Sequence, residues 1–407
     1  MTTPAAMLTE DYDIVILGAG PVGSTLALLL AGSHHRILLV EQRTLATGRD
    51  DPRALALSEG ARQLLAPQRA WPTPTGAGDG RCTAIETIHI SQDGGFGRTL
   101  IDHKDYQVPA LGYVVRYGAL IGCLHDALQQ AMVRHPGQIT CLENTHVDVA
   151  ANDPNANTDP FWHTLHINGR NIRTRLIVHA EGTPPDHSSG VIARGYGQRA
   201  LIFEAGLVQS HQQRAWERFT PQGPLALLPV DGPGGKRVSV VYTVPEQAAE
   251  AILQLDDEAI LQRIQKAIGP LARFTDVGSR ASFPLKLRLR QPAKQDRELW
   301  IGNAAQTLHP VSGQGFNLGL RDAAQLAQTL RLSLDPGSAH TLDLFVRSRQ
   351  LDRYGAAAFT DGIVRAFSTP FPLISTARGI GLSALDLISP LRHFVARRMI
   401  WGARAWP

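Results

Sequence analysis

Three closely spaced glycines near the start of the chain have the spacing of a phosphate-binding turn. Gly18, Gly20 and Gly23 form a GxGxxG motif, and Glu41 follows roughly 20 residues after the second glycine. Gly18 would permit a tight turn, Gly20 would let a pyrophosphate approach the backbone, and Gly23 would let a helix pack closely on a strand. Glu41 would accept hydrogen bonds from ribose hydroxyls. The chemistry predicted is the binding of a dinucleotide.

The segments around this motif must position it, and their composition is that of a strand, turn, helix and strand. Tyr12–Leu17 and Arg36–Val40 are short apolar runs that predict buried strands, and Ser24–Ala31 predicts a helix. The N-terminus of that helix would offer free N–H groups to the phosphates. Gly379–Ala384 also matches the glycine pattern, but it has no preceding strand and no suitably spaced carboxylate. One dinucleotide-binding unit is therefore predicted.

A second glycine-rich segment lies late in the chain. Glu298–Gly302 predicts a short buried strand, residues 303–317 form a loop rich in glycine, and Leu318–Leu332 has the apolar spacing of a helix. A glycine-rich loop that leads into a helix N-terminus can stabilise negative charge on a ring oxygen. The residues alone also allow an ordinary loop between a strand and a helix.

Together the two segments resemble the FAD-dependent aromatic hydroxylases of the p-hydroxybenzoate hydroxylase type. That family combines an early GxGxxG motif, a middle Asp-Gly segment and a late Gly-Asp-Ala-Ala-His loop. Gly302–Pro310, Asp51–Ala54 and Gly112–Val115 are most similar to the ubiquinone-biosynthesis hydroxylases, in the 2-polyprenyl-6-methoxyphenol hydroxylase branch. The likeness covers nearly the whole chain.

The resemblance implies a set of cofactor-binding residues. These are Gly18, Gly20, Gly23, Glu41, Arg53, Arg116, Gly182, Asn303, Pro310, Gly313, Gly315 and Asn317. The early glycines would face the FAD pyrophosphate and Glu41 the ribose, while the two arginines would contact flavin or phosphate groups. Asn303 would bind the ribityl chain and pyrophosphate, and the last four residues would line the isoalloxazine. Asn303 and Glu181, which precedes Gly182, stand where the family has Asp.

The resemblance also implies a reaction. NAD(P)H would serve as co-substrate and reduce FAD, the reduced flavin would add O2 at C4a, and the hydroperoxide would hydroxylate an electron-rich phenol. The sequence contains no HExxH, no GxSxG and no Cys pair, which argues against a metal site or a nucleophilic residue. His309 lies near the flavin by analogy, but no catalytic residue is assigned. The substrate implied is a polyprenylated (methoxy)phenol of ubiquinone biosynthesis. Alternatives are another aromatic substrate, a flavin reductase of prenyl chains, or a non-catalytic flavin-binding subunit.

The predicted fold class is α/β, with α+β character in a second domain. A Rossmann-like FAD-binding domain would comprise residues 1–75, 102–185 and 293–345. A mixed-sheet substrate domain would comprise 76–101 and 186–292, and 346–407 would form a C-terminal helical region. Within the substrate domain, Ala84–Ser91 predicts one strand and Glu246–Ile268 one helix.

Composition excludes several classes of protein. Forty basic and 36 acidic residues among 407 give a net charge of +4, too small to argue for nucleic-acid binding. A hydrophobic fraction of 43% excludes a largely disordered chain. Three cysteines, Cys82, Cys123 and Cys141, exclude a disulfide scaffold and suit a reducing cytosol. Ile14–His35 lacks charged residues, but its glycines and the absence of a basic flank argue against a signal peptide or membrane span. We therefore expect a cytoplasmic protein.

The end of the chain is basic. Residues 339–407 contain nine arginines and four aspartates. In this stretch Leu391, Phe394, Val395 and Met399 recur at helical spacing beside three of the arginines. Such a helix would suit an anionic membrane surface at the inner face, or another protein of ubiquinone biosynthesis. The alternative is a helix packed on the flavin domain with a solvated basic face.

Overall fold

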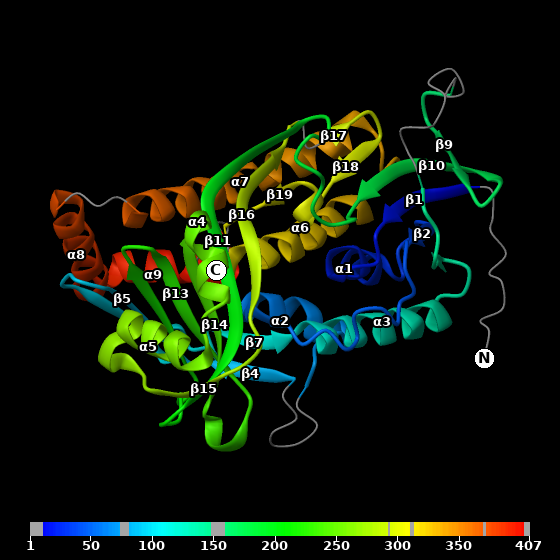
Figure 1. The fold of residues 1–407 in the computed structure, drawn as a ribbon. Helices are drawn as coiled ribbons and strands as arrows, with labels where there is room; N and C mark the ends of the chain where they lie inside the picture. Colours follow the sequence, from blue (N-terminus) through cyan, green and yellow to red (C-terminus); the bar gives the residue numbers. More distant parts are fainter. Residues whose placement is uncertain are drawn as a thin grey trace.

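The chain forms three β-sheets connected and covered by helices, as the computed structural model shows (Figure 1). The structure describes residues 11–73, 81–147, 159–291, 294–309, 313–368 and 372–402. The GxGxxG motif belongs to the first sheet and the late glycine-rich segment adjoins it. The largest sheet forms the other half of the molecule (Figure 1).

The first sheet contains the predicted strand–turn–helix–strand unit. Its strand order is β17-β18-β10-β1-β2-β8, with β9 paired to β10. β18, β10, β1, β2 and β8 run parallel, as expected when helices connect the strands. The bounds are β1 (Asp11–Leu17), β2 (Ile37–Val40), β8 (Ile139–Leu142), β9 (His163–Ile167), β10 (Arg170–His179), β17 (Lys294–Gln295) and β18 (Glu298–Trp300).

Strand β1 is buried on both faces, which explains its nearly continuous apolar sequence. On one face, Ile14 and Ile16 share a core with α1 (Pro21–Leu30), α3 (Tyr117–Arg134) and α6 (Gln314–Arg331). On the other face, Val15 and its neighbours share a core with β9 and β10. Both faces of the strand therefore hold the glycine turn in place.

The second sheet has nine strands and is mostly antiparallel. Its order is β19-β16-β11-β14-β13-β12-β5-β6, with β15 paired to β11, and β12 and β5 are parallel. The bounds are β5 (Thr87–Gln92), β6 (Arg98–Asp102), β11 (Val191–Leu207), β12 (Arg214–Thr220), β13 (Gly223–Val230), β14 (Arg237–Pro245), β15 (Phe274–Val277), β16 (Ala281–Arg290) and β19 (Gln306–Thr307).

A small third sheet and the remaining helices join these parts. In this sheet β7 (Gly112–Arg116) lies between β3 (Ala54–Ser58) and β4 (Cys82–Ile85). The remaining α-helices are α2 (Glu59–Leu65), α4 (Glu246–Leu253), α5 (Asp257–Ile268), α7 (Ala339–Ser368), α8 (Pro372–Leu387) and α9 (Ser389–Trp401). Figure 1 shows α7 running along the molecule, with α8 and α9 at the end opposite β1.

Two predicted elements are wrong in detail. The helix predicted over Glu246–Ile268 is two helices, because the Asp256 carboxylate accepts a 2.8 Å hydrogen bond from the Ala259 N–H and so begins α5 anew. The single strand predicted over Ala84–Ser91 is split between β4 in the small sheet and β5 in the large one. The boundaries of the predicted domains stay predictions.

No helix in the described part of the chain is long and apolar enough to cross a membrane.

Candidate active site

The GxGxxG turn has the geometry that a bound pyrophosphate requires. Gly18 has a φ of +96°, and a Cβ on it would lie 2.7 Å from the carbonyl oxygen of Ala180. A Cβ on Gly23 would lie 1.9 Å from the carbonyl oxygen of Gly18, so helix α1 packs directly on the turn. A Cβ on Gly20 would instead project into open space, with no contact within 4 Å. Gly20 precedes the first residue of α1, so this space lies at a helix N-terminus.

Two side chains hold the turn in place. Glu41 was predicted from the sequence to belong to this site, and His125 was not. Glu41 accepts a 2.7 Å hydrogen bond from the Ala19 N–H and a 3.1 Å bond from the Arg43 N–H. Its carboxylate still has lone pairs for ribose hydroxyls. His125 of α3 is buried, and its ring nitrogens lie 2.8 and 2.9 Å from the carbonyl oxygens of Leu45 and Ala19. Helical periodicity marks His125 only as a core position, so this contact was not predictable from the sequence.

The late glycine-rich segment lies beside the same helix end. Cβ atoms on Gly302 and Gly319 would lie 3.1 and 3.0 Å from Cγ2 of Val22, in the first turn of α1. Asn303, the next residue, is exposed beside this contact. The two segments that predicted a cofactor site are therefore adjacent in the fold, although Gly302 follows Gly23 by 279 positions in the sequence.

A buried carboxylate that sequence reasoning missed fixes this second segment. Asp322 of α6 is 3% exposed, and it accepts hydrogen bonds from the Gly302 N–H at 3.1 Å and from Nε2 of Gln306 at 2.6 Å. Its other oxygen pairs with Nε of Arg349 on α7 at 2.8 Å. The sequence does place an acid on the apolar side of α6. Since acids are seldom buried unless they are paired, this position could have indicated a buried ion pair.

The N-terminus of α6 is fastened to the small sheet. The Asn317 side chain accepts a 2.8 Å hydrogen bond from the Ser58 N–H and donates bonds of 2.9 and 3.2 Å to the carbonyl oxygens of Gly313 and Ala56. Asn317 therefore shapes the turn that precedes α6, and its direct contact with the isoalloxazine stays a prediction. A Cβ on Gly315 would meet no atom within 4 Å, which leaves space above the first turn of the helix.

The neighbouring His309 is a packing residue in this structure. It is 1% exposed, and burial lowers its pKa to about 4, so its ring is neutral near pH 7. Its ring lies edge-on to Tyr196, with 5.2 Å between centroids. Pro310 lies outside the described residues.

Both predicted arginines have carboxylate partners. Arg53 pairs with Asp51 at 2.7 Å, and Arg116 pairs with Glu204 and donates a 2.9 Å hydrogen bond to the carbonyl oxygen of Pro52. A phosphate or flavin contact by either guanidinium would have to be shared with these groups.

The middle motif is built differently from the family pattern. The Glu181 carboxylate, next to Gly182, lies 3.1 Å from Nδ1 of His179 at the end of β10, and Glu298 lies 3.1 Å from the other ring nitrogen. Burial lowers the pKa of His179, but its two carboxylate partners outweigh that effect and the pKa is raised. The His179 ring stacks on Trp300 with 4.6 Å between centroids. The longer side chain of Glu181 therefore reaches a protein partner.

A cavity of about 800 Å³ extends from the late glycine-rich segment to the second sheet. Gly313, Gly315 and Asn303 line one end, the inward faces of β5, β12, β13 and β14 form a wall, and α7, α8 and α9 close the other side. Most of its lining is aliphatic or aromatic. The polar side chains that the structure describes in the lining are Glu217, Thr243, Asn303, Thr307 and Arg378. Volume and lining are typical of a site for a small apolar molecule.

Comparison with known proteins identifies the group. A model of the FAD binding domain matches residues 170–357. The ubiquinone hydroxylase UbiL of Rhodospirillum rubrum is 30% identical, over 97% of this chain and 91% of that protein. The chain belongs to the FAD-dependent aromatic hydroxylases. The mitochondrial ubiquinone biosynthesis monooxygenase COQ6 of Homo sapiens is 26% identical to this chain, over 94% of this chain and 91% of that protein.

Solved structures share the fold of the hydroxylase. The p-nitrophenol 4-monooxygenase PnpA of Pseudomonas putida has a TM-score of 0.70 at 15% identity, over 97% of this chain and 100% of that one. PqsL of Pseudomonas aeruginosa has a TM-score of 0.68 at 20% identity, over 91% and 99% of the two chains. The α/β fold class predicted from the sequence is confirmed.

The residues of the hydroxylase fit FAD, on the evidence of its own geometry. The space at Gly20 would admit a pyrophosphate at the N-terminus of α1, with the Glu41 carboxylate beside the same turn. The space at Gly315 would admit the edge of a flat ring at the N-terminus of α6. The backbone at both places is free of an intruding side chain, as close approach of a cofactor requires.

Proposed function

We propose that the hydroxylase acts on the ring of a polyprenylated (methoxy)phenol in ubiquinone biosynthesis, with NAD(P)H as reductant and O2 as oxidant. The observation that carries this proposal is the apolar cavity of about 800 Å³ that adjoins the proposed FAD ring site. A substituted phenol with an attached prenyl chain is mostly hydrocarbon, and burial of its surface would supply the binding free energy. The names of the UbiL and COQ6 relatives support the pathway.

The chain's own residues would bind, orient and exclude water. Gly18, Gly20 and Gly23 would admit the pyrophosphate, and Glu41 would accept hydrogen bonds from the ribose. Gly313 and Gly315 would place the N-terminus of α6 beside the ring, where its N–H groups stabilise negative charge. When bound and reduced, FAD supplies the activated oxygen atom. The apolar wall would keep water from that oxygen, so that it reaches the substrate.

The quinone intermediates of cells that lack this protein test the assignment to the pathway. We expect a prenylated methoxyphenol to accumulate, and the wild-type gene to restore the normal profile. Gly20→Val should not restore it, because the new side chain would fill the pyrophosphate space. An unchanged ubiquinone profile would contradict the pathway and leave another aromatic substrate or a prenyl-chain reductase.

The outer surface of α8 and α9 carries an apolar patch beside this cavity. The patch consists of Ile380, Leu387, Ile388, Leu391 and Phe394, whose side chains are 40–81% exposed. Large apolar side chains exposed along two consecutive helices are candidates for an interaction surface.

Two residues of α9 face a different side of the helix from the one that the sequence predicts. Val395 and Met399 were expected on the same face as Leu391 and Phe394, but they line the cavity instead. Ala396 lies in a core with Tyr106, so α9 is packed on the body of the protein and also exposes apolar groups outward.

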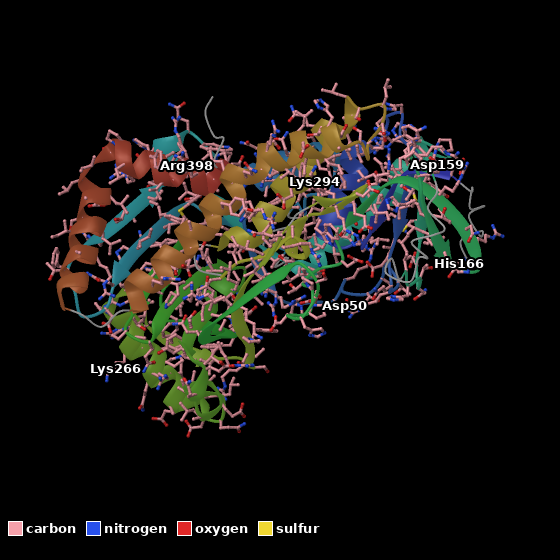
Figure 2. The ribbon with its side chains drawn as sticks, turned by 90° about the horizontal axis from the view of Figure 1, so that it is seen from above. Asp50, Asp159, His166, Lys266, Lys294 and Arg398 are labelled. Atoms are coloured by element: carbon pink, nitrogen blue, oxygen red, sulfur yellow. The ribbon has the colours of Figure 1, made fainter. Side chains whose placement is uncertain are left out.

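Positive charge accompanies the patch. Arg397 is exposed, and the Arg398 guanidinium lies over the Phe394 ring, 3.6 Å from its centroid. Figure 2 shows Arg398 at one end of the molecule, far from Asp159 and His166 at the other. We propose that this end rests on an anionic bilayer. A prenyl chain would then pass from the bilayer between α8 and α9 into the cavity.

Vesicle binding measures this contact. The wild type is expected to sediment with vesicles that contain an anionic lipid, less so at high salt, and weakly with neutral vesicles. The double variant Leu387→Glu, Leu391→Glu should bind on the order of 10-fold more weakly, since it places charge against the acyl chains. Leu332→Glu is the matched control, because Leu332 is 88% exposed after α6 and outside the patch. Equal binding by both variants, or none by the wild type, would contradict the proposal.

A further inference from the structure

One carboxylate projects from the apolar wall of the cavity. Strand β12 alternates between two faces, and Ala215, Glu217 and Phe219 of one face line the cavity. Trp216 of the other face packs in the core that α4 and α5 cover and also reaches the cavity lining. Arg218 points away from the cavity, because its Nε donates a 2.9 Å hydrogen bond to the carbonyl oxygen of Ala267 at the end of α5. A charge at the inward position breaks the apolar pattern.

Among the residues that the structure describes, the neighbours of Glu217 supply neither a counter-charge nor a hydrogen bond. Its register partners on the adjoining strands are Ile90 of β5 and Ala226 of β13, both in the cavity lining. No hydrogen bond or ion pair between described residues engages its carboxylate. Glu217 is half-buried in the cavity wall. A carboxylate in apolar surroundings without a partner is costly in a folded protein, and such groups are concentrated at functional sites.

The elements across the cavity add little charge. There α7 contributes Phe359 and Ile363, α9 contributes Val395 and Met399, and α8 contributes Arg378. On the opposite face of β12, Arg218 pairs with Asp93 at 3.2 Å. Burial raises the pKa of Glu217 to about 7, with no charged group identified as a cause. The carboxyl therefore changes its protonation near neutral pH, as a group that exchanges a proton with substrate should.

We propose that Glu217 is the base that accepts the phenolic proton of the substrate as the ring is hydroxylated. This role rests on the proposed function, since it requires a phenol in the cavity. The cavity that Glu217 lines is the one that Gly313 and Gly315 line at the proposed ring site. A phenol there would place its apolar substituents against the wall and its hydroxyl against the carboxylate.

The proposed step conserves atoms and electrons. The O–H bond of the phenol breaks, its proton moves to a Glu217 oxygen, and its electron pair moves into the ring. The activated ring carbon forms a C–O bond to the oxygen atom derived from O2, while the bond between the two oxygen atoms breaks and the second atom leaves as water. NAD(P)H supplies the two electrons that reduce this second oxygen atom to water. The ring carbon then loses its hydrogen as a proton, and Glu217 returns the proton that it holds to the product.

Binding without turnover tests the role of Glu217 directly. The probes are an ortho-prenylphenol and its methyl ether, which has the same shape but no O–H donor, each measured by equilibrium dialysis with the FAD-loaded protein and no NAD(P)H. In the wild type, preference for the phenol should rise roughly 10-fold as the pH rises through about 7, because the ionised carboxylate is the stronger acceptor. In Glu217→Gln the preference should be independent of pH. Glu217→Asp should recover part of the dependence.

Turnover supplies the second readout. With the prenylphenol, kcat of Glu217→Gln should fall on the order of 100-fold while KM changes little. The rise of wild-type kcat through about pH 7 should disappear. Glu258→Gln is the matched control, because Glu258 is exposed on α5. FAD content and the circular dichroism spectrum of each variant establish that it is folded and loaded.

The possible results separate this inference from the proposed function. If the wild type binds neither probe, the proposed substrate class is wrong, and the role of Glu217 with it. If it binds both equally at every pH, or if Glu217→Gln keeps the wild-type dependence, the substrate class stands and the inference about Glu217 is overturned.

Discussion

Asp322→Ala is expected to lower the free energy of unfolding by about 3–5 kcal/mol, the range for removal of one partner from a buried ion pair. The Asp322 carboxylate is 3% exposed and accepts hydrogen bonds from the Gly302 N–H, the Gln306 side chain and Arg349. Its loss leaves Asp352 as the one carboxylate partner of the buried Arg349 guanidinium among the described residues, and it leaves the Gly302 N–H without its acceptor. Chemical denaturation followed by circular dichroism would measure the change.

Two further variants separate the ion pair from a general loss of stability. Asp322→Leu combined with Arg349→Leu should be more stable than Asp322→Ala, because no unpaired charge remains. Asp343→Ala on α7 should change stability little, since it removes a solvent-exposed pair with Lys294. Equal destabilisation by Asp322→Ala and Asp343→Ala would contradict the role given to the buried network.

Gly20→Val should leave the protein folded and weaken FAD binding on the order of 100-fold, about 2.7 kcal/mol. Its Cβ would enter open space, so the fold has no clash to relieve, and the side chain would fill the position proposed for the pyrophosphate. Titration of the apoprotein with FAD, followed by quenching of flavin fluorescence, gives the affinity.

Gly23→Ala is the contrasting variant in the same turn. Its Cβ would lie 1.9 Å from the carbonyl oxygen of Gly18, so the helix must move away from the strand. We expect it to lower the free energy of unfolding by about 1–3 kcal/mol, the usual range for overpacking. A Gly20→Val protein that is unfolded, or that keeps wild-type FAD affinity, would refute the position given to the pyrophosphate.

The sequence predicts well the parts of this fold that are local. Tyr12–Leu17, the glycine turn and the strand at Arg36–Val40 lie within 40 residues, and apolar runs, glycines and spacing suffice to order them. The structure places β1 and β2 within one residue of those bounds. Helix α6 was predicted to begin at Leu318 and begins four residues earlier, at Gln314, where the Asn317 side chain fastens its first turn to β3.

Contacts between distant segments were not predictable in the same way. His125 bonds a carbonyl group 106 residues away, and Asp322 pairs with a helix that follows it, so neither contact leaves a local pattern. Glu217 did leave a local pattern, since it occupies an inward position of a strand that alternates between two faces. Its importance depends on the helices that close the cavity, and the sequence does not place those helices. The same closure turns Val395 and Met399 inward, where periodicity alone grouped them with Leu391.

We propose that this protein inserts one atom of O2 into a prenylated phenol ring. The most direct test incubates the purified, FAD-loaded protein with NAD(P)H, an ortho-prenylphenol and O2 enriched in heavy oxygen, and determines the product by mass spectrometry. We expect a product that is heavier by one hydroxyl oxygen and carries the heavy isotope in its ring fragment. A product that gains two hydrogens instead, or a hydroxyl whose oxygen comes from water, would contradict it.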